Sequence, residues 1–187
     1  GDYSDSASLA TKTEADKLYA AGAYAEAWDI YAVLGEAYHT HDADYSAMYN
    51  AADEARASGN YDAAYDGFAA LGNYRDAKNK MTQCGVEKAE SLYAAGSYTD
   101  AAEVYEFLGD SAKVTECIYA YAGQLREQGE YLPAAQQYEA IMDYADSRDQ
   151  HYQMGLQARD NDKLADAYAI FVADPEYRDT QEAIYQT

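Results

Sequence analysis

The segment that decides the fold reads GAYAEAWDIYAVLG over residues 22–35. Its pattern is a glycine, a tyrosine two residues later, a small alanine, and then an aromatic residue. The pattern returns as GNYDAAYDGFAALG at residues 59–72 and as GSYTDAAEVYEFLG at residues 96–109. Two further copies begin at Gly129 and, in degenerate form, at Asp162. The starts at 22, 59, 96, 129 and 162 are 37, 37, 33 and 33 residues apart, so the chain is built from internal repeats.

Each position of the pattern has a physical role. A glycine ends a helix in a left-handed conformation that other residues adopt only at a cost. The tyrosine and the alanine, three residues apart, share one face of the next helix, and the small alanine lets a partner helix approach closely. A small and a mostly apolar residue stand seven and four residues before each glycine, as Ala15 and Leu18 do in the first copy. These form the apolar stripe of a preceding helix, so each copy predicts two antiparallel helices.

This pattern resembles the tetratricopeptide repeat, whose typical period is about 34 residues. The resemblance covers nearly the whole chain and is to a divergent form found in larger proteins of gut Firmicutes. The proline that the family carries after its second helix is missing here, and Leu34-Gly35 and its equivalents stand in its place. The resemblance implies an all-α fold, a right-handed superhelix (α-solenoid) of antiparallel helical hairpins, and a role in protein binding.

A Tyr-x-Asp element follows the second helix of several copies. We expect its aspartate to lie in the first turn of the following helix, where a negative charge suits the helix dipole. The element occurs as Tyr74-Arg75-Asp76, Tyr144-Ala145-Asp146 and Tyr177-Arg178-Asp179.

The repeat pattern predicts a single solenoid over residues 1–187, with a partial helix from residue 177. Residues 1–6 match residues 72–77, which predicts that the chain begins in mid-repeat and is a fragment of a larger protein. The five expected hairpins cover residues 7–34, 43–71, 74–108, 111–142 and 145–172.

The composition limits the partners. The chain has 34 Asp and Glu against 13 Lys and Arg, a net charge of −21. Such a field repels phosphate backbones and anionic lipids, so we expect no nucleic acid partner, and it favours basic partners or simply solubility. No stretch approaches the roughly 20 apolar residues of a membrane span, so we expect no membrane insertion by this segment. No signal peptide is visible, and the compartment stays open between cytoplasmic and the extracytoplasmic part of an anchored bacterial protein.

A candidate binding face follows from the repeat. Residues three and ten before each turn glycine share one face of the first helices, which line the concave side of such solenoids. Arginine can hold a carboxylate with two hydrogen bonds, and tyrosine offers a rigid amphipathic contact. We therefore expect a groove for a protein or peptide with acidic groups or a C-terminal carboxylate. Its predicted residues, here called the Tyr/Arg face, are Tyr19, Tyr49, Arg56, Tyr93, Tyr119, Arg126, Tyr152 and Arg159.

Two alternatives stay open for this face. The tyrosines could pack between repeats while the arginines pair with nearby carboxylates, which would be a purely structural role. The second alternative is a different function, namely a carbohydrate-binding element that uses exposed tyrosines as stacking platforms.

The sequence offers little for catalysis or metal binding. Cys84 and Cys117 hold equivalent positions on successive helices, about 8–10 Å apart, which predicts packing and no disulfide. The run His39-Thr40-His41-Asp42-Ala43-Asp44 is the one cluster with ligand chemistry, and as a single local run it is more typical of a polar connection. Whether His39, His41, Asp42 and Asp44 bind anything is open. No phosphate loop, metalloprotease or nucleophile motif occurs, so we expect no enzyme, no cofactor and no metal.

Overall fold

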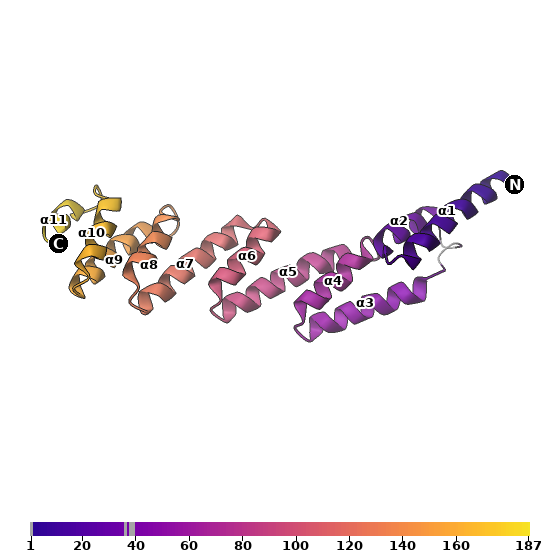
Figure 1. Ribbon diagram of the computed structural model, residues 1–187, viewed down its shortest axis with the longest axis horizontal. Helices are drawn as coiled ribbons and strands as arrows, with labels where there is room; N and C mark the ends of the chain where they lie inside the picture. The colour runs from indigo at the N-terminus through magenta and orange to yellow at the C-terminus, as the bar shows by residue number, and fades with distance from the viewer. Residues whose placement is uncertain (1, 36, 38–39) are drawn as a thin grey trace. The chain divides into compact units, whose positions relative to one another are not determined.

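The computed structural model describes residues 2–35, 37 and 40–187, with only the backbone of residues 2–5, and in this part the chain forms eleven helices (Figure 1). The odd-numbered helices are the first helices of the hairpins, and the even-numbered ones are the second helices. Their bounds are Asp2–Ala20 (α1), Tyr24–Leu34 (α2), Asp42–Ala57 (α3), Tyr61–Leu71 (α4), Ala77–Ala94 (α5), Tyr98–Leu108 (α6), Ser111–Glu127 (α7), Tyr131–Glu139 (α8), Ser147–Asp160 (α9), Leu164–Ala173 (α10) and Thr180–Tyr185 (α11).

The helices pack in chain order, which confirms the expected all-α class and the sequential hairpins. Helix α1 packs against α2, and α3 packs against α4. From α6 to α10, each helix packs against the next one in the chain. The second helices of successive hairpins are also in contact, namely α2 with α4 and α8 with α10. The chain divides into two compact units, Gly1–Lys88 and Ala89–Thr187, which are described separately below. The right-handed superhelix and the tetratricopeptide identity stay predictions.

The turn within each hairpin forms as the glycine pattern predicts. Gly22, Gly59, Gly96 and Gly129 have φ between 77° and 82°. Asp162, which replaces glycine in the degenerate copy, adopts a similar conformation with φ of 58°. Aspartate is one of the few other residues that tolerate this region, so the fifth hairpin keeps its turn without glycine.

The expected helix starts were wrong at the Tyr-x-Asp elements. We expected helices from residues 74, 145 and 177, but α5, α9 and α11 begin after the element, at Ala77, Ser147 and Thr180. The reason is that the middle residue of each element has a φ of +50°, which interrupts the helix. Those middle residues are Arg75, Ala145 and Arg178.

Two related expectations also need correction. Asp146 and Asp179 are the N-cap residues of α9 and α11 rather than members of the first turn, and neither side chain caps its own helix. At the other end of the chain, α1 begins at Asp2 and not at residue 7. The backbone of residues 2–6 is helical, whereas the matching residues 72–76 form a turn.

Small residues set the distance between the paired helices. Ala27 and Ala64 are fully buried in the first unit, as Ala101, Ala134 and Ala167 are in the second. Large rings fill the layers beside them, among them Tyr31, Phe68 and Tyr138. At Gly67 the approach is so close that a Cβ atom would lie 2.9 Å from the Cβ of Ala52 on α3. Cys84 and Cys117 are buried free thiols, as their positions predicted.

Replacing Ala101 tests this packing. Its side chain is 0% exposed. We expect Ala101→Leu to lower the free energy of unfolding by about 1–3 kcal/mol through overpacking. Ala101→Glu should cost at least as much, because it also buries a carboxylate. Urea unfolding measures both, and Ala112→Leu, at an exposed position of α7, is the matched control with a change within about 0.5 kcal/mol. A neutral Ala101→Glu would show that the repeat register is wrong.

Candidate functional site

Three tyrosines of the Tyr/Arg face make the same contact to the next hairpin. The hydroxyl of Tyr49 donates to Asp76 Oδ1 at 2.5 Å, and that of Tyr119 donates to Asp146 Oδ1 at 2.6 Å. Tyr152 donates in the same way to Asp179. In each case the acceptor is the aspartate of a Tyr-x-Asp element, 27 residues further along the chain. We call this contact the tyrosine latch.

The rings of the three latch tyrosines also pack against neighbouring aromatic rings. Tyr119 lies edge-on to Tyr138 of α8, with ring centres 5.5 Å apart, and edge-on to Tyr144 of the Tyr-x-Asp element, at 5.7 Å. Edge-to-face contacts of this kind add stabilisation beyond the buried area. The other two latch tyrosines also lie between two rings, although Tyr152 is tilted at 50° to Phe171 rather than edge-on. Their ring sets are Phe68, Tyr49 and Tyr74, and Phe171, Tyr152 and Tyr177.

The latch couples the ionisation of both partners. The hydrogen bond to Asp146, together with burial, raises the pKa of Tyr119 to about 12. Burial, with the hydrogen bond to Asp179 second, raises the pKa of Tyr152 to about 12. In return, the hydroxyl of Tyr119 lowers the pKa of Asp146 below its usual value. Each pair is therefore held as a neutral phenol and an ionised carboxylate across the neutral pH range.

The arginines of the face have unequal partners. Arg56 binds Glu87 with two hydrogen bonds, Nε at 2.8 Å and Nη2 at 2.5 Å, so its charge is matched. Arg126 donates from Nη1 to the neutral amide oxygen of Gln150 at 3.0 Å. An amide carries no net charge, so this bond is not an ion pair, while the charge of Arg126 acts on the nearby carboxylate of Asp146 and lowers the pKa of that group.

Arg159 resembles Arg126. Its Nη1 donates to the amide oxygen of Gln186 at 3.4 Å, and its Nε lies 3.6 Å from the carboxylate of Asp160. A long contact to a neighbouring residue on the helix surface contributes little, so Arg159 also retains donors for another carboxylate.

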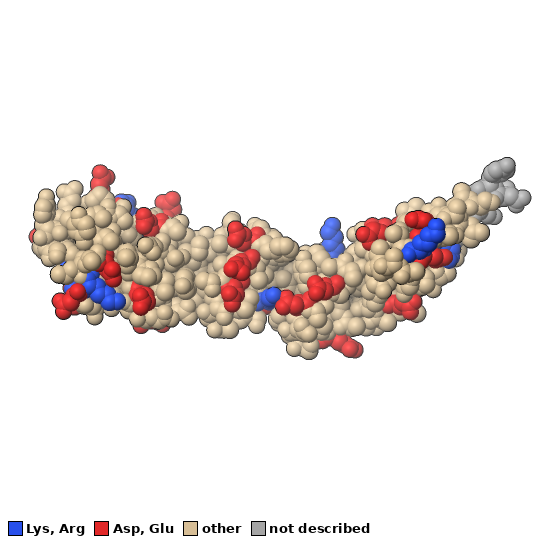
Figure 2. Space-filling view, in the orientation of Figure 1, with Lys and Arg blue, Asp and Glu red and all other residues tan. Residues whose placement is uncertain are grey.

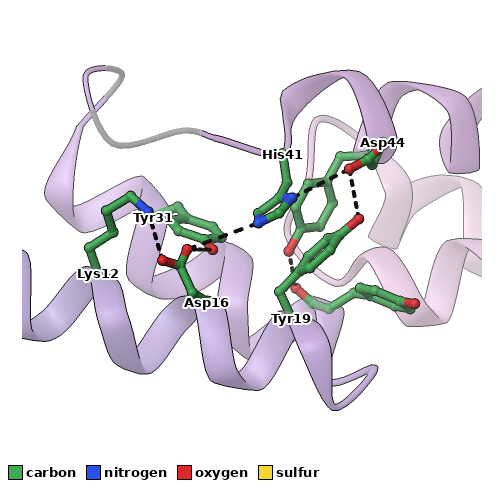
Figure 3. A network of polar contacts seen from close by, with 8 residues as sticks. Lys12, Asp16, Tyr19, Tyr31, His41 and Asp44 are labelled. Carbon is green, nitrogen blue, oxygen red and sulfur yellow. Dashed lines mark hydrogen bonds and ion pairs between the residues drawn. The ribbon is translucent and has the colours of Figure 1, made fainter.

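A different contact joins the first two hairpins (Figure 3). The His41 ring stacks on Tyr19, with ring centres 3.6 Å apart and planes 10° from parallel. Tyr19 donates to Asp44 Oδ2 at 2.9 Å, and His41 Nδ1 lies 3.3 Å from the same oxygen. Burial first, and Asp44 second, raise the pKa of Tyr19 to about 12.

The same network continues onto α1 and α2. Asp16 accepts hydrogen bonds from Lys12 Nζ at 2.7 Å and from the hydroxyl of Tyr31 at 2.6 Å. These two bonds, that of Lys12 first, lower the pKa of Asp16. His41 Nε2 lies 4.0 Å from Asp16 Oδ1, so one imidazole faces a carboxylate on either side.

The histidine run of the sequence is therefore part of a packed contact. His39 lies outside the described residues, while His41 and Asp44 are engaged as above. Within the part of the chain that the structure describes, no group of three His, Cys, Asp or Glu side chains is placed to hold a metal ion.

The eight predicted residues are divided between the units. Tyr19, Tyr49 and Arg56 lie in the first, and the remaining five lie in the second. Tyr93 is 37% exposed and Tyr152 only 6%, while the others are half-buried. For the latch tyrosines and Arg56, the structural alternative describes the contacts observed. Sequence reasoning missed the aspartates as their partners, although the recurring spacing of 27 residues between tyrosine and aspartate was visible.

Comparison with protein families, with curated proteins and with solved structures finds no match in any of the three. Among the described residues, no helix combines the length and apolar character that crossing a membrane requires.

Removing one latch hydroxyl should weaken the array measurably. Tyr119→Phe keeps the ring contacts and deletes the bond to Asp146, so we expect a loss of about 1 kcal/mol in the free energy of unfolding. Tyr61→Phe is the control, because no hydrogen bond of the Tyr61 hydroxyl exists within the described residues. A double-mutant cycle with Asp146→Asn in urea should give non-additive losses, and strict additivity would contradict the latch.

The raised tyrosine pKa values predict alkaline unfolding. The pKa of Tyr19, Tyr119 and Tyr152 is about 12 in the folded protein, against 10.0 ordinarily. Because the folded value is the higher one, the stabilisation is complete below pH 10 and is lost as the pH rises toward 12. Phenolate absorbance and helical circular dichroism should therefore change together in this window. Full ionisation near pH 10 with the helices intact would refute the assignment.

Proposed function

We propose that this chain is a protein-interaction module that presents the Tyr/Arg face of its first helices, as a concave groove, to a peptide or protein partner. The observation that carries the proposal is the bonding of Arg126. In a chain of net charge −21, its guanidinium is held in place on the face by a neutral amide and keeps its charge. A carboxylate of a partner would form a charge-assisted hydrogen bond with this guanidinium, which no carboxylate of the described residues bonds directly.

The contacts within the protein indicate which side chains of the Tyr/Arg face a partner can use. The hydroxyls of Tyr49, Tyr119 and Tyr152 are used between hairpins, so these residues offer a partner only the exposed parts of their rings, which are smallest at Tyr152. Arg126 and Arg159 supply the charge. Arg56 contributes least, because Glu87 already holds it with two bonds.

The surrounding charge fits a partner with a localised acidic end rather than an acidic stretch. Figure 2 shows carboxylates spread over the visible face with scattered basic groups. A long acidic segment would be repelled by the net charge, while a single carboxylate at short range is attracted to the nearest arginine. The same field argues against a nucleic acid partner. The proposal includes no catalytic step and no cofactor.

Carbohydrate binding is the weaker alternative for this face. Stacking on a sugar needs an exposed ring, ideally with others in the same plane. Tyr93 is the most exposed tyrosine of the face at 37%, and its neighbour Tyr98 lies at 68° to it. The latch tyrosines are also covered edge-on by other rings.

Selection and a charge-matched control test the proposal. Peptides with free C-termini, selected by display on the parent protein, should lose affinity in Arg126→Ala and Arg159→Ala by about 1–3 kcal/mol each, measured by fluorescence anisotropy. Amidation of the peptide C-terminus should cause a similar loss. Lys17→Ala removes the same charge from an exposed position of α1 and should bind like the parent. Equal affinity of parent and double variant for all selected peptides would exclude the face.

A further inference from the structure

A cavity of about 120 Å³ opens in the second unit where the end of α5 meets α6 and α7. It has room for several water molecules or for the head group of one side chain. Its lining residues are Glu90, Tyr93, Tyr105, Lys113 and Glu116.

A tyrosine that is buried apart from a small part of its surface lines this cavity. Tyr105 is 4% exposed and lines the cavity, and its hydroxyl makes no hydrogen bond within the described residues. Burial first, and then the charge of Glu90, raise the pKa of Tyr105, while Lys113 acts in the opposite direction. The oxygen of this hydroxyl is not fully enclosed by the protein, so a polar group that enters the cavity can reach it.

The first hairpin shows what fills the equivalent space. Asp16, Tyr19 and Tyr31 have the same spacing from Gly22 as Glu90, Tyr93 and Tyr105 have from Gly96. There, the imidazole of His41, the N-cap residue of α3, stacks on the tyrosine and faces the carboxylate (Figure 3). The hydroxyl of the buried tyrosine, Tyr31, is satisfied by Asp16.

The second hairpin fills the space with a cation. Asp53 and Phe68 occupy the positions of Glu90 and Tyr105. Lys80 of the following helix places Nζ 2.5 Å from Asp53 Oδ1 and 5.8 Å from the centre of the Phe68 ring. In both hairpins a nitrogen-bearing side chain thus lies between an aromatic ring and a carboxylate.

The third hairpin lacks this internal contact. In this hairpin the residue equivalent to Lys80 is Lys113. Lys113 forms an ion pair with Glu116 on its own helix, at 2.6 Å. Glu90 has neither an ion pair nor a hydrogen bond among the described residues. The lining therefore has two carboxylates for one ammonium group, and a net negative charge.

We propose that this cavity binds the guanidinium group of an arginine side chain from a partner protein. The group stacks on Tyr93, as His41 does on Tyr19, and donates hydrogen bonds to Glu90 and to the hydroxyl of Tyr105. Arginine fits better than lysine, because its planar group both stacks on a ring and offers several donors in one plane. This site is separate from the carboxylate recognition proposed for Arg126 and Arg159, and it matches the preference of an acidic chain for basic partners.

Two short peptides, identical except for arginine or the neutral isostere citrulline, test the proposal. Titration into ¹⁵N-labelled protein should give saturable shifts around the cavity with the arginine peptide, with a dissociation constant on the order of 1 mM. The citrulline peptide should cause no saturable change. Equal responses to both peptides, or none to either, would overturn the proposal.

A matched pair of variants separates a local bond from general attraction. Glu90→Gln should weaken arginine binding about fivefold or more. Glu106→Gln removes the same charge from an exposed position of α6 and should leave binding unchanged. Equal weakening by both would show long-range attraction only, and no site. Glu90→Gln should also leave the binding of C-terminal carboxylate peptides unaltered, so this proposal and the proposed function can fail independently.

Discussion

The structure depends on how each hairpin holds the next one. A single pair of short helices cannot bury its apolar face alone, so arrays of this kind gain stability from contacts between neighbours. The tyrosine latch supplies such a contact three times. Tyr49, Tyr119 and Tyr152 each insert a ring between two others and donate a hydrogen bond to an aspartate. In each case this aspartate stands directly before the next odd-numbered helix. Ring packing and a charge-assisted hydrogen bond thus act at one point.

This contact accounts for the composition. The chain has 22 tyrosines against 3 phenylalanines, because rings between neighbouring hairpins lie close to the surface and the hydroxyl can reach a carboxylate. Part of the acidic surplus serves the same contact. Between α6 and α7 the chain has no Tyr-x-Asp element, only Gly109-Asp110, and there the second unit has a cavity instead of a latch.

The sequence predicted the parts that depend on local spacing. The turn glycines, the buried alanines and the order of helices follow from periodicity. The starts of α5, α9 and α11 were not predicted, because each helix is preceded by a residue with a positive φ. Arginine and alanine, the residue types at Arg75, Ala145 and Arg178, do not indicate that conformation. For the Tyr/Arg face, the sequence left open whether its side chains are free or already paired. Which hydroxyls are already bonded depends on how one hairpin meets the next, and spacing within a hairpin does not contain that information.

Repetition makes it possible to compare one position in three environments. The acidic residue six places before the turn glycine meets His41 in the first hairpin and Lys80 in the second. In the third, Glu90 meets the cavity. Since neighbouring hairpins couple only locally, the chain can leave one such position unfilled without disturbing the others. A ligand that binds at Glu90, Tyr93 and Tyr105 needs the folded hairpin, because α5 and α6 together supply these residues. Such a ligand stabilises the folded state, so recognition and local folding are coupled at this position.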